Sequence, residues 1–95
     1  MLAWFYILRL RSGSLYLGAT SDLETRYQDH LSGQACRTTV LDPPLALVYS
    51  EKFKTFSEAR RREAQVKRWS RAKKEALVCG DIATLKNLAQ SKEHH

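Results

Sequence analysis

The pattern of apolar positions along the chain predicts three β-strands. Residues 3–10 are apolar or aromatic at nearly every position, which is typical of a strand buried on both faces. A turn signal at residues 11–13 separates this run from a second apolar run over residues 14–18, so the two runs predict a hairpin. A third run, over residues 45–50, predicts the last strand of the same sheet.

Polar capping residues predict four helices between and after these strands. The expected N-caps are Ser21, Thr55, Ser70 and Asp81. Glu24 and Glu58 follow the first two caps by three residues and complete capping boxes, and Gly80 is suited to end the third helix. Residues 34–44 end in two adjacent prolines and are expected to form a loop.

These elements predict an α+β fold, in which helices flank a small three-stranded sheet, mixed or antiparallel, in the order β-β-α-β-α-α-α. The 95 residues suffice for one hydrophobic core, so we expect a single domain over residues 1–90. Residues 91–95 are expected to be a tail, and its two histidines resemble the remnant of a purification tag. No apolar run approaches the roughly 20 residues that span a bilayer, so no membrane segment is expected.

The net charge of +6 comes from one segment of the chain. Residues 1–50 hold four basic and four acidic side chains, whereas residues 51–75 hold ten basic and four acidic ones. A basic segment of this density is the electrostatic footprint expected for a polyanionic partner such as DNA. The alternative is a solvated helix face that only keeps the protein in solution. Cys36 and Cys79 lie far apart without a CxxC motif, which favours free thiols and a cytoplasmic location.

Glu63 is expected on the apolar side of its helix. The inward positions predicted by helical spacing are Phe56, Ala59, Glu63 and Val66. A buried carboxylate without a partner is very costly, so Glu63 needs a cation. Either a divalent metal ion binds it, or a basic neighbour reaches it. The neighbours within reach are Arg60, Arg62 and Lys67.

Arg26 and His30 present a similar choice. They lie four residues apart and so project from one side of the helix that follows the hairpin. An arginine on a helix surface is usually only solvated, but the imidazole one turn away also makes this pair a candidate site.

Several motifs in order resemble the GIY-YIG nuclease family, which includes the catalytic domains of homing endonucleases and of an excinuclease. Phe-Tyr-Ile at residues 5–7 and Leu-Tyr-Leu-Gly at residues 15–18 resemble the two motifs that name the family. Residues 18–30 are similar to its continuation G-x-T-x-x-L-x-x-R-x-x-x-H. Residues 57–77 resemble one branch of short, stand-alone bacterial proteins. The resemblance extends to about Leu77.

The resemblance implies a metal-dependent endonuclease that hydrolyses DNA, is selective for DNA structure more than sequence, and suits DNA repair. It implies that Glu63 is the single protein ligand of Mg²⁺ or Mn²⁺, with no organic cofactor. Tyr6 and Tyr16 would flank the attacking water and the scissile phosphate. Arg26 would stabilise the developing negative charge, and His30 would assist proton transfer.

The basic helices would bind the phosphates of the substrate. The side chains expected to do so are Arg61, Lys67, Arg68, Arg71, Lys73 and Lys74. Two other interpretations stay open: a catalytically weak module that binds DNA through the same helices, and an adaptor whose basic face meets an acidic protein.

Two departures from the family pattern bear on these roles. Phe5 replaces the glycine of the first motif and leaves Tyr6 in place. In the segment 33–44, Thr38 stands where a tyrosine is expected, and basic residues are replaced by Val40, Asp42 and Pro43. The second departure affects the grip on the substrate more than the chemistry.

The length of the hairpin loop decides whether the two tyrosines can share a site. A two-residue turn would send Tyr6 and Tyr16 to opposite faces, because successive side chains on a strand alternate. A three-residue loop over residues 11–13 instead pairs Leu8 with Tyr16 and places both tyrosines on one face. We therefore expect the three-residue loop, with Arg26 and Glu63 facing the same side as the tyrosines.

Overall fold

The computed structural model describes residues 2–80 of the chain. The elements in order are β1 (Ala3–Leu10), β2 (Leu15–Thr20), α1 (Leu23–Leu31), α2 (Arg37–Leu41), β3 (Pro44–Phe53), α3 (Phe56–Lys67) and α4 (Arg71–Cys79). The helix expected from Asp81 and the expected tail lie outside the described residues. Over residues 2–80, no helix combines the length and the apolar character needed to cross a membrane.

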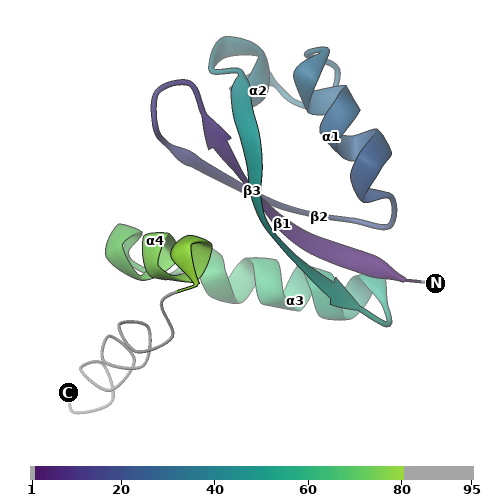
Figure 1. The fold of residues 1–95 in the computed structure, drawn as a ribbon. Coiled ribbons are helices and arrows are strands. Elements are labelled where there is room, and N and C mark those ends of the chain that lie inside the picture. Colours follow the sequence, from purple (N-terminus) through teal and green to yellow (C-terminus); the bar gives the residue numbers. More distant parts are fainter. Residues whose placement is uncertain (1, 81–95) are drawn as a thin grey trace.

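The three strands form one antiparallel sheet in the order β2-β1-β3. Helix α1 lies over one face of this sheet, and α3 and α4 lie over the other (Figure 1). The α+β class and the three-stranded sheet are therefore confirmed, and the sheet is antiparallel throughout. The order of elements along the described chain is β-β-α-α-β-α-α, because the expected loop over residues 34–44 contains α2, a helix of five residues. The prolines follow this helix and do not interrupt it.

The hairpin between β1 and β2 has the expected three-residue loop. Leu10 N–H donates to the Ser14 carbonyl oxygen at 2.9 Å, and Gly13 N–H donates to the Leu10 carbonyl oxygen at 2.9 Å. Gly13 takes a left-handed φ of +94°, which a residue without a Cβ adopts at little cost. Leu8 consequently pairs with Tyr16 and Tyr6 with Gly18.

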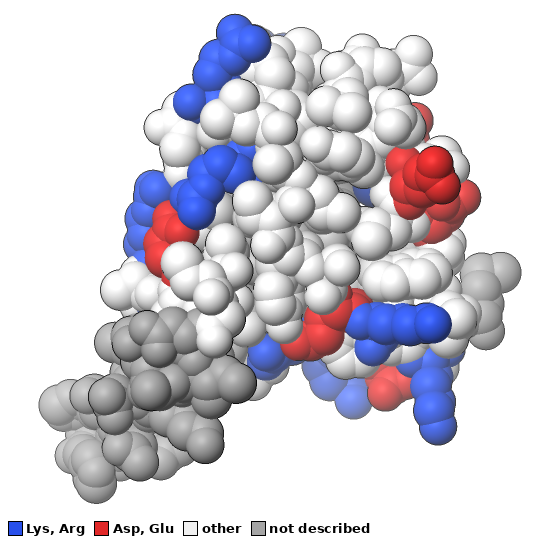
Figure 2. Space-filling view, viewed as in Figure 1, with Lys and Arg blue, Asp and Glu red and all other residues white. Residues whose placement is uncertain are grey.

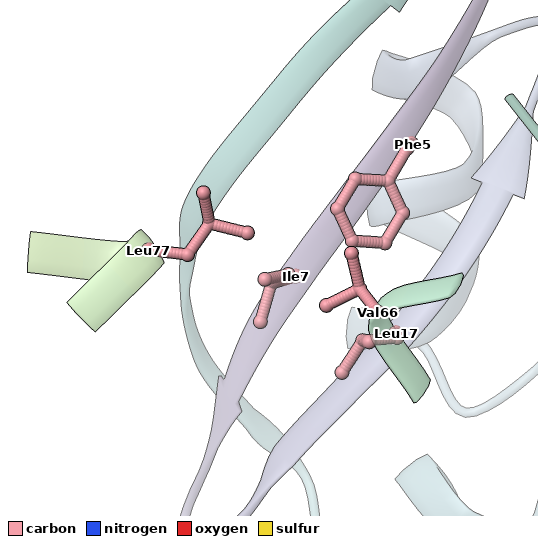
Figure 3. Packing of buried hydrophobic residues seen from close by; sticks show 5 residues of the cluster. All are labelled: Phe5, Ile7, Leu17, Val66 and Leu77. Carbon is pink, nitrogen blue, oxygen red and sulfur yellow. The ribbon is translucent and has the colours of Figure 1, made fainter. Parts of the chain in front are cut away.

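Strand alternation divides the core of the protein into two clusters. On the α3 side, Phe5 and Ile7 pack with Leu17, and α3 and α4 contribute Val66 and Leu77 (Figure 3). On the α1 side lie Tyr6, Leu8, Leu10, Tyr16, Leu23, Tyr27 and Leu47. Each face of β1 is therefore covered, as expected for a strand that is apolar at successive positions.

The predicted helix caps are correct at α3 and α4 and wrong at α1. Thr55 accepts a hydrogen bond from the Glu58 N–H, and Ser70 accepts one from the Lys73 N–H. The cap of α1 is Asp22, whose carboxylate accepts from the Thr25 N–H, so the box expected from Ser21 begins one residue too early. The inward position expected for Phe56 is also wrong, because this residue lies in the first turn of α3 and is 44% exposed.

An ion pair fixes α4 against β1 on the α3 side of the sheet. The Arg9 guanidinium donates two hydrogen bonds of 2.6 Å to the Glu75 carboxylate. Arg71 donates to the same carboxylate at 3.3 Å and to the Gly13 carbonyl oxygen at 2.7 Å. This bidentate geometry aligns the start of α4 with the hairpin loop.

Candidate active site

Tyr6 lies at the centre of the candidate site and is almost fully buried. Its side chain leaves β1 on the α1 face, where 3% of the residue is exposed, and its ring passes over Gly18 of β2. A Cβ atom on Gly18 would lie 2.5 Å from the Tyr6 Cζ atom, so no larger residue fits beneath the ring. The absence of a side chain at Gly18 therefore provides the space that the Tyr6 ring occupies.

His30 connects Tyr6 to the end of α1. It is only 1% exposed, and its Nε2 atom lies 2.8 Å from the Tyr6 hydroxyl oxygen. The ring also meets both tyrosines edge to face, with centroid distances of 5.8 Å to Tyr6 and 4.9 Å to Tyr16. The prediction that Tyr6 and Tyr16 share one face of the sheet is thereby confirmed.

The site has depth, because its side chains differ in exposure. Tyr6 and His30 form the floor, Tyr16 is half-buried above them, and Arg26 is exposed. The side chain of Glu63 is 12% exposed. A substrate that approaches from solvent would therefore meet Arg26 and Tyr16 before Tyr6.

The environment keeps both phenols protonated at neutral pH. Burial raises the pKa of Tyr16 to about 12, and burial together with the neighbouring Tyr16 raises the pKa of Tyr6 above its ordinary value. The charge of Arg26 lowers the pKa of both phenols, and that of Glu63 raises it. Burial, and then Arg26, lowers the pKa of His30 and keeps its imidazole neutral. Additional positive charge is therefore needed before either tyrosine can act as a base.

Arg26 and Glu63 reach the tyrosines from different sides. Both charges act on both phenols, but α1 and α3 lie on opposite faces of the sheet. The helices that carry Arg26 and Glu63 thus cover opposite faces, whereas the expectation that the two side chains face the same site stays a prediction. Because β2 is at the edge of the sheet, a side chain from α1 and one from α3 can both reach the tyrosines past this strand.

Glu63 forms ion pairs with two of its three expected neighbours. The Lys67 Nζ atom lies 2.7 Å from one carboxylate oxygen, and the Arg60 Nε atom lies 3.8 Å from the other. Arg62 instead pairs with Glu51 at 3.0 Å. Over residues 2–80, no three His, Cys, Asp or Glu side chains are grouped to hold a metal ion, so an ion on Glu63 would complete its ligands with water and phosphate oxygens.

The basic residues of α3 and α4 do not form one uniform surface. On the face shown in Figure 2, acidic side chains lie among the basic ones near the margins of the molecule. Arg61 and Arg68 line a shallow hollow beside Trp69, on the side of α3 turned away from Glu63. Lys73 is 8% exposed, with its ammonium 4.1 Å from the Trp69 ring centroid. Lys74 is half-buried, and Arg71 makes the contacts described above.

The sequence did not predict two residues of the site, Thr39 and Cys36. Thr39 is 1% exposed, and its hydroxyl lies 3.0 Å from the Nδ1 atom of His30. Cys36 precedes α2 at its N-cap position, and its Sγ atom lies 3.5 Å from the Thr39 hydroxyl oxygen. Burial raises the pKa of this thiol, but hydrogen bonds led by those from Thr39 outweigh burial and lower the pKa below its ordinary value. The sequence held little signal for either, because both lie in the segment expected to be a loop.

The sequence and the fold are those of a known family. The GIY-YIG catalytic domain family matches residues 2–76, and the chain therefore belongs to it. Within it, the chain groups with the UPF0213 family of small bacterial proteins. A UPF0213 protein of Staphylococcus saprophyticus is 43% identical over 75 residues, which cover 79% of this chain and 92% of the relative.

Two solved relatives share the fold. The solution NMR structure of a UPF0213 protein from Bacillus halodurans is 40% identical, covers 83% of this chain and 84% of its own, and has a TM-score of 0.54. That of a protein from E. faecalis is 34% identical, covers 87% and 88%, and has a TM-score of 0.58. The family thus extends over nearly the whole described chain.

Replacing Gly18 by Ala is expected to disturb the floor of the site. The new methyl group would overlap the Tyr6 ring, and β2 is held in register with β1, so the ring must move. We expect a loss of about 1–3 kcal/mol in the free energy of unfolding, measured by denaturant titration.

The matched control is Gly13→Asn in the same hairpin. A Cβ there meets no atom within 4 Å, and Asn tolerates the left-handed conformation. Its cost comes from the strain of the left-handed backbone alone and should stay at about 1 kcal/mol, below that of Gly18→Ala. Equal losses in the two variants would show that Gly18 is not packed under Tyr6.

Proposed function

We propose that this chain is a metal-dependent endonuclease that hydrolyses phosphodiester bonds in DNA. The observation that carries the proposal is the convergence of four groups: two tyrosines on one face of a hairpin, with a cation from α1 and a carboxylate from α3 acting on both hydroxyls. Phosphodiester hydrolysis needs an activated water, a Lewis acid and a positive charge near the phosphoryl oxygens. Arg26 supplies the positive charge, Glu63 can hold the Lewis acid, and the two tyrosines can position the water and the phosphate. Membership of the GIY-YIG family supports a nuclease-like function.

Glu63 is the residue that would hold Mg²⁺ or Mn²⁺. A single carboxylate suits Mg²⁺, which usually keeps several waters and takes substrate phosphate oxygens as further ligands. When bound, the ion supplies the Lewis acid and the positive charge that the buried phenols need. Lys67 neutralises Glu63 in the structure, and its 56% exposed side chain can turn away to a phosphate.

The other side chains act directly on the substrate. Arg26 is exposed and its charge acts on both tyrosines, so it is the side chain that we propose stabilises negative charge on the phosphoryl oxygens. Tyr16 is half-buried and can position the phosphate, whereas Tyr6 lies deeper, beside His30. Contacts to phosphates carry no base sequence directly, so we propose selectivity for DNA structure and, with it, a place in DNA repair in the cytoplasm.

A catalytically weak DNA-binding module is the second candidate, and one observation favours it. In α2, Val40 is 51% exposed and Leu41 is 70% exposed, in the segment where the resemblance to the family implies basic residues. An apolar rim of this kind weakens the grip on a polyanion without altering the tyrosines. Cleavage and binding must therefore be measured separately.

Glu63→Gln is expected to abolish cleavage and to preserve the fold. Amide oxygen is a poor substitute for a carboxylate on a divalent ion, and Lys67 and Arg60 are exposed enough to be hydrated once their partner is neutral. We expect a loss of stability below about 1 kcal/mol. The assay uses branched, nicked, duplex and single-stranded DNA with Mg²⁺ or Mn²⁺, and a thermal melt is recorded on the same samples.

Glu58→Gln on the same helix is the control, since Gln also serves in a capping box. This variant should cleave as the wild type does. If Glu63→Gln instead cleaves normally and loses about 3 kcal/mol or more, Glu63 is half of a structural ion pair.

Two pairs of charges on α3 test where the DNA lies. Arg60 and Lys67 lie on the Glu63 side of the helix, whereas Arg61 and Arg68 lie about 140–160° around it. If the phosphates pass the candidate site, replacing the first pair by Ala should lower the slope of log affinity against log salt by about 0.9 for each lost contact with duplex DNA. The second pair, equal in charge, should change the slope less. The reverse order would place the DNA on the outer face of α3, away from the tyrosines.

A further inference from the structure

His30 uses both of its ring nitrogens in hydrogen bonds inside the protein. Nε2 lies 2.8 Å from the Tyr6 hydroxyl, and Nδ1 lies 3.0 Å from the Thr39 hydroxyl. His30 and Thr39 are each 1% exposed, so neither can meet a substrate directly. The hydrogen bond through which His30 can influence the reaction is the one to Tyr6.

The hydrogen-bond partners decide which nitrogen carries the proton. The Thr39 hydroxyl donates to the Cys36 carbonyl oxygen at 3.3 Å, and it also lies 3.5 Å from the Cys36 Sγ atom. Its two lone pairs are then left to accept from His30 Nδ1–H and from the Cys36 thiol. Nε2 then bears a lone pair and accepts the Tyr6 hydroxyl proton. In this arrangement every proton in the hydrogen-bond network that runs from Tyr6 through His30 and Thr39 to Cys36 has an acceptor.

The opposite tautomer leaves the Tyr6 proton without an acceptor inside the described protein, although the Cys36 carbonyl keeps the Val40 N–H. If Nε2 carried the proton, it would donate to the Tyr6 oxygen, and Thr39 would have to donate to Nδ1 in place of the Cys36 carbonyl. His30 is the one hydrogen-bond partner of the Tyr6 hydroxyl among residues 2–80, so the Tyr6 proton would then have to be directed at a water molecule in the site. Because Tyr6 is almost fully buried and holding a water there costs entropy, the first arrangement, with every partner inside the protein, is favoured.

We propose that Thr39 is a positioning residue: it holds the buried His30 with the proton on Nδ1, so that Nε2 takes the Tyr6 hydroxyl proton. With its proton directed at His30, the Tyr6 oxygen presents only lone pairs to the site. It can accept a hydrogen bond from a water molecule but cannot donate one to a phosphate oxygen. Tyr6 therefore orients the attacking water, and contact with the phosphate is left to Tyr16 and Arg26; this consequence rests on the proposed function, whereas the tautomer does not.

This role also explains why a five-residue helix stands between α1 and β3. Thr39 is the third residue of α2, and the Cys36 carbonyl that fixes its hydroxyl also accepts the Val40 N–H at 3.2 Å. The helix thus holds the threonine in one orientation beneath His30. Thr38, the preceding residue, is exposed and provides a matched control.

The tautomer can be measured directly by two-bond ¹H–¹⁵N correlation of the imidazole. Replacing His94 and His95 by Ala leaves His30 as the only histidine in the chain. In this chain we expect the proton on Nδ1, with Nε2 showing the shift of an unprotonated nitrogen. A proton on Nε2 would overturn the proposal, and this result needs no further variant.

Variants at residue 39 test whether Thr39 sets the tautomer. Thr39→Ser keeps the hydroxyl and should keep the wild-type imidazole spectrum, as should Thr38→Val. Thr39→Val keeps the shape but removes the acceptor, and should shift His30 toward the Nε2–H form. An unchanged tautomer in Thr39→Val would show that the hydroxyl does not set it.

Activity gives an independent readout. Thr39→Val should lower kcat between about 10- and 100-fold, as the loss of a group that orients a metal-ligating histidine does, with KM little changed. Thr39→Ser should restore kcat. If Thr39→Val loses activity but Thr39→Ser does not restore it, the role of Thr39 is packing. If the wild type cleaves no DNA, the proposed function fails, while the tautomer measurement still decides the hydrogen-bond arrangement.

Discussion

The pairing of β1 with β2 is the constraint on which the rest of the structure depends. Strand side chains alternate between two faces, so a register shift of one residue would move Tyr16 away from Tyr6 and Leu17 out of the opposite core. The three-residue loop, closed by Gly13 in a left-handed conformation, holds Leu8 opposite Tyr16. The loop therefore fixes the positions of both the tyrosines in the candidate site and the core residues beneath α3.

Around this hairpin, the two faces of the sheet have different tasks. The α3 face supplies packing through Phe5, Ile7 and Val66, and it also brings Glu63 to the edge strand. The α1 face supplies the tyrosines, His30 and Arg26, and α2 closes it with Thr39. Gly18 lies where these contributions meet, because the ring of Tyr6 needs the space above it. Burial keeps both phenols protonated, so a tyrosine can act as a base only with additional positive charge nearby. A metal ion would supply that charge, which is why it is central to the proposed chemistry.

The sequence predicted what depends on counting along the chain. The hairpin register followed from the alternation of side chains and one glycine, and the caps at Thr55 and Ser70 followed from local hydrogen bonding. It did not predict what depends on packing in three dimensions. No local pattern shows that α1 and α3 cover opposite faces, or that a Thr in a presumed loop lies beneath His30. Short helices such as α2 carry too few residues for a periodic signal, so Thr39 and Cys36 emerged only from the structure.

The central claim is that Tyr6, Tyr16, Arg26 and Glu63 form one site organised around a divalent metal ion. Paramagnetic broadening by Mn²⁺ in an NMR titration, with and without DNA, tests this most directly. The account predicts that the signals of Glu63, Tyr16 and their neighbours in β2 broaden first, and that Glu63→Gln abolishes this effect while its spectrum elsewhere stays that of the folded protein. Broadening centred on another part of the chain, or the same broadening in Glu63→Gln, would contradict it.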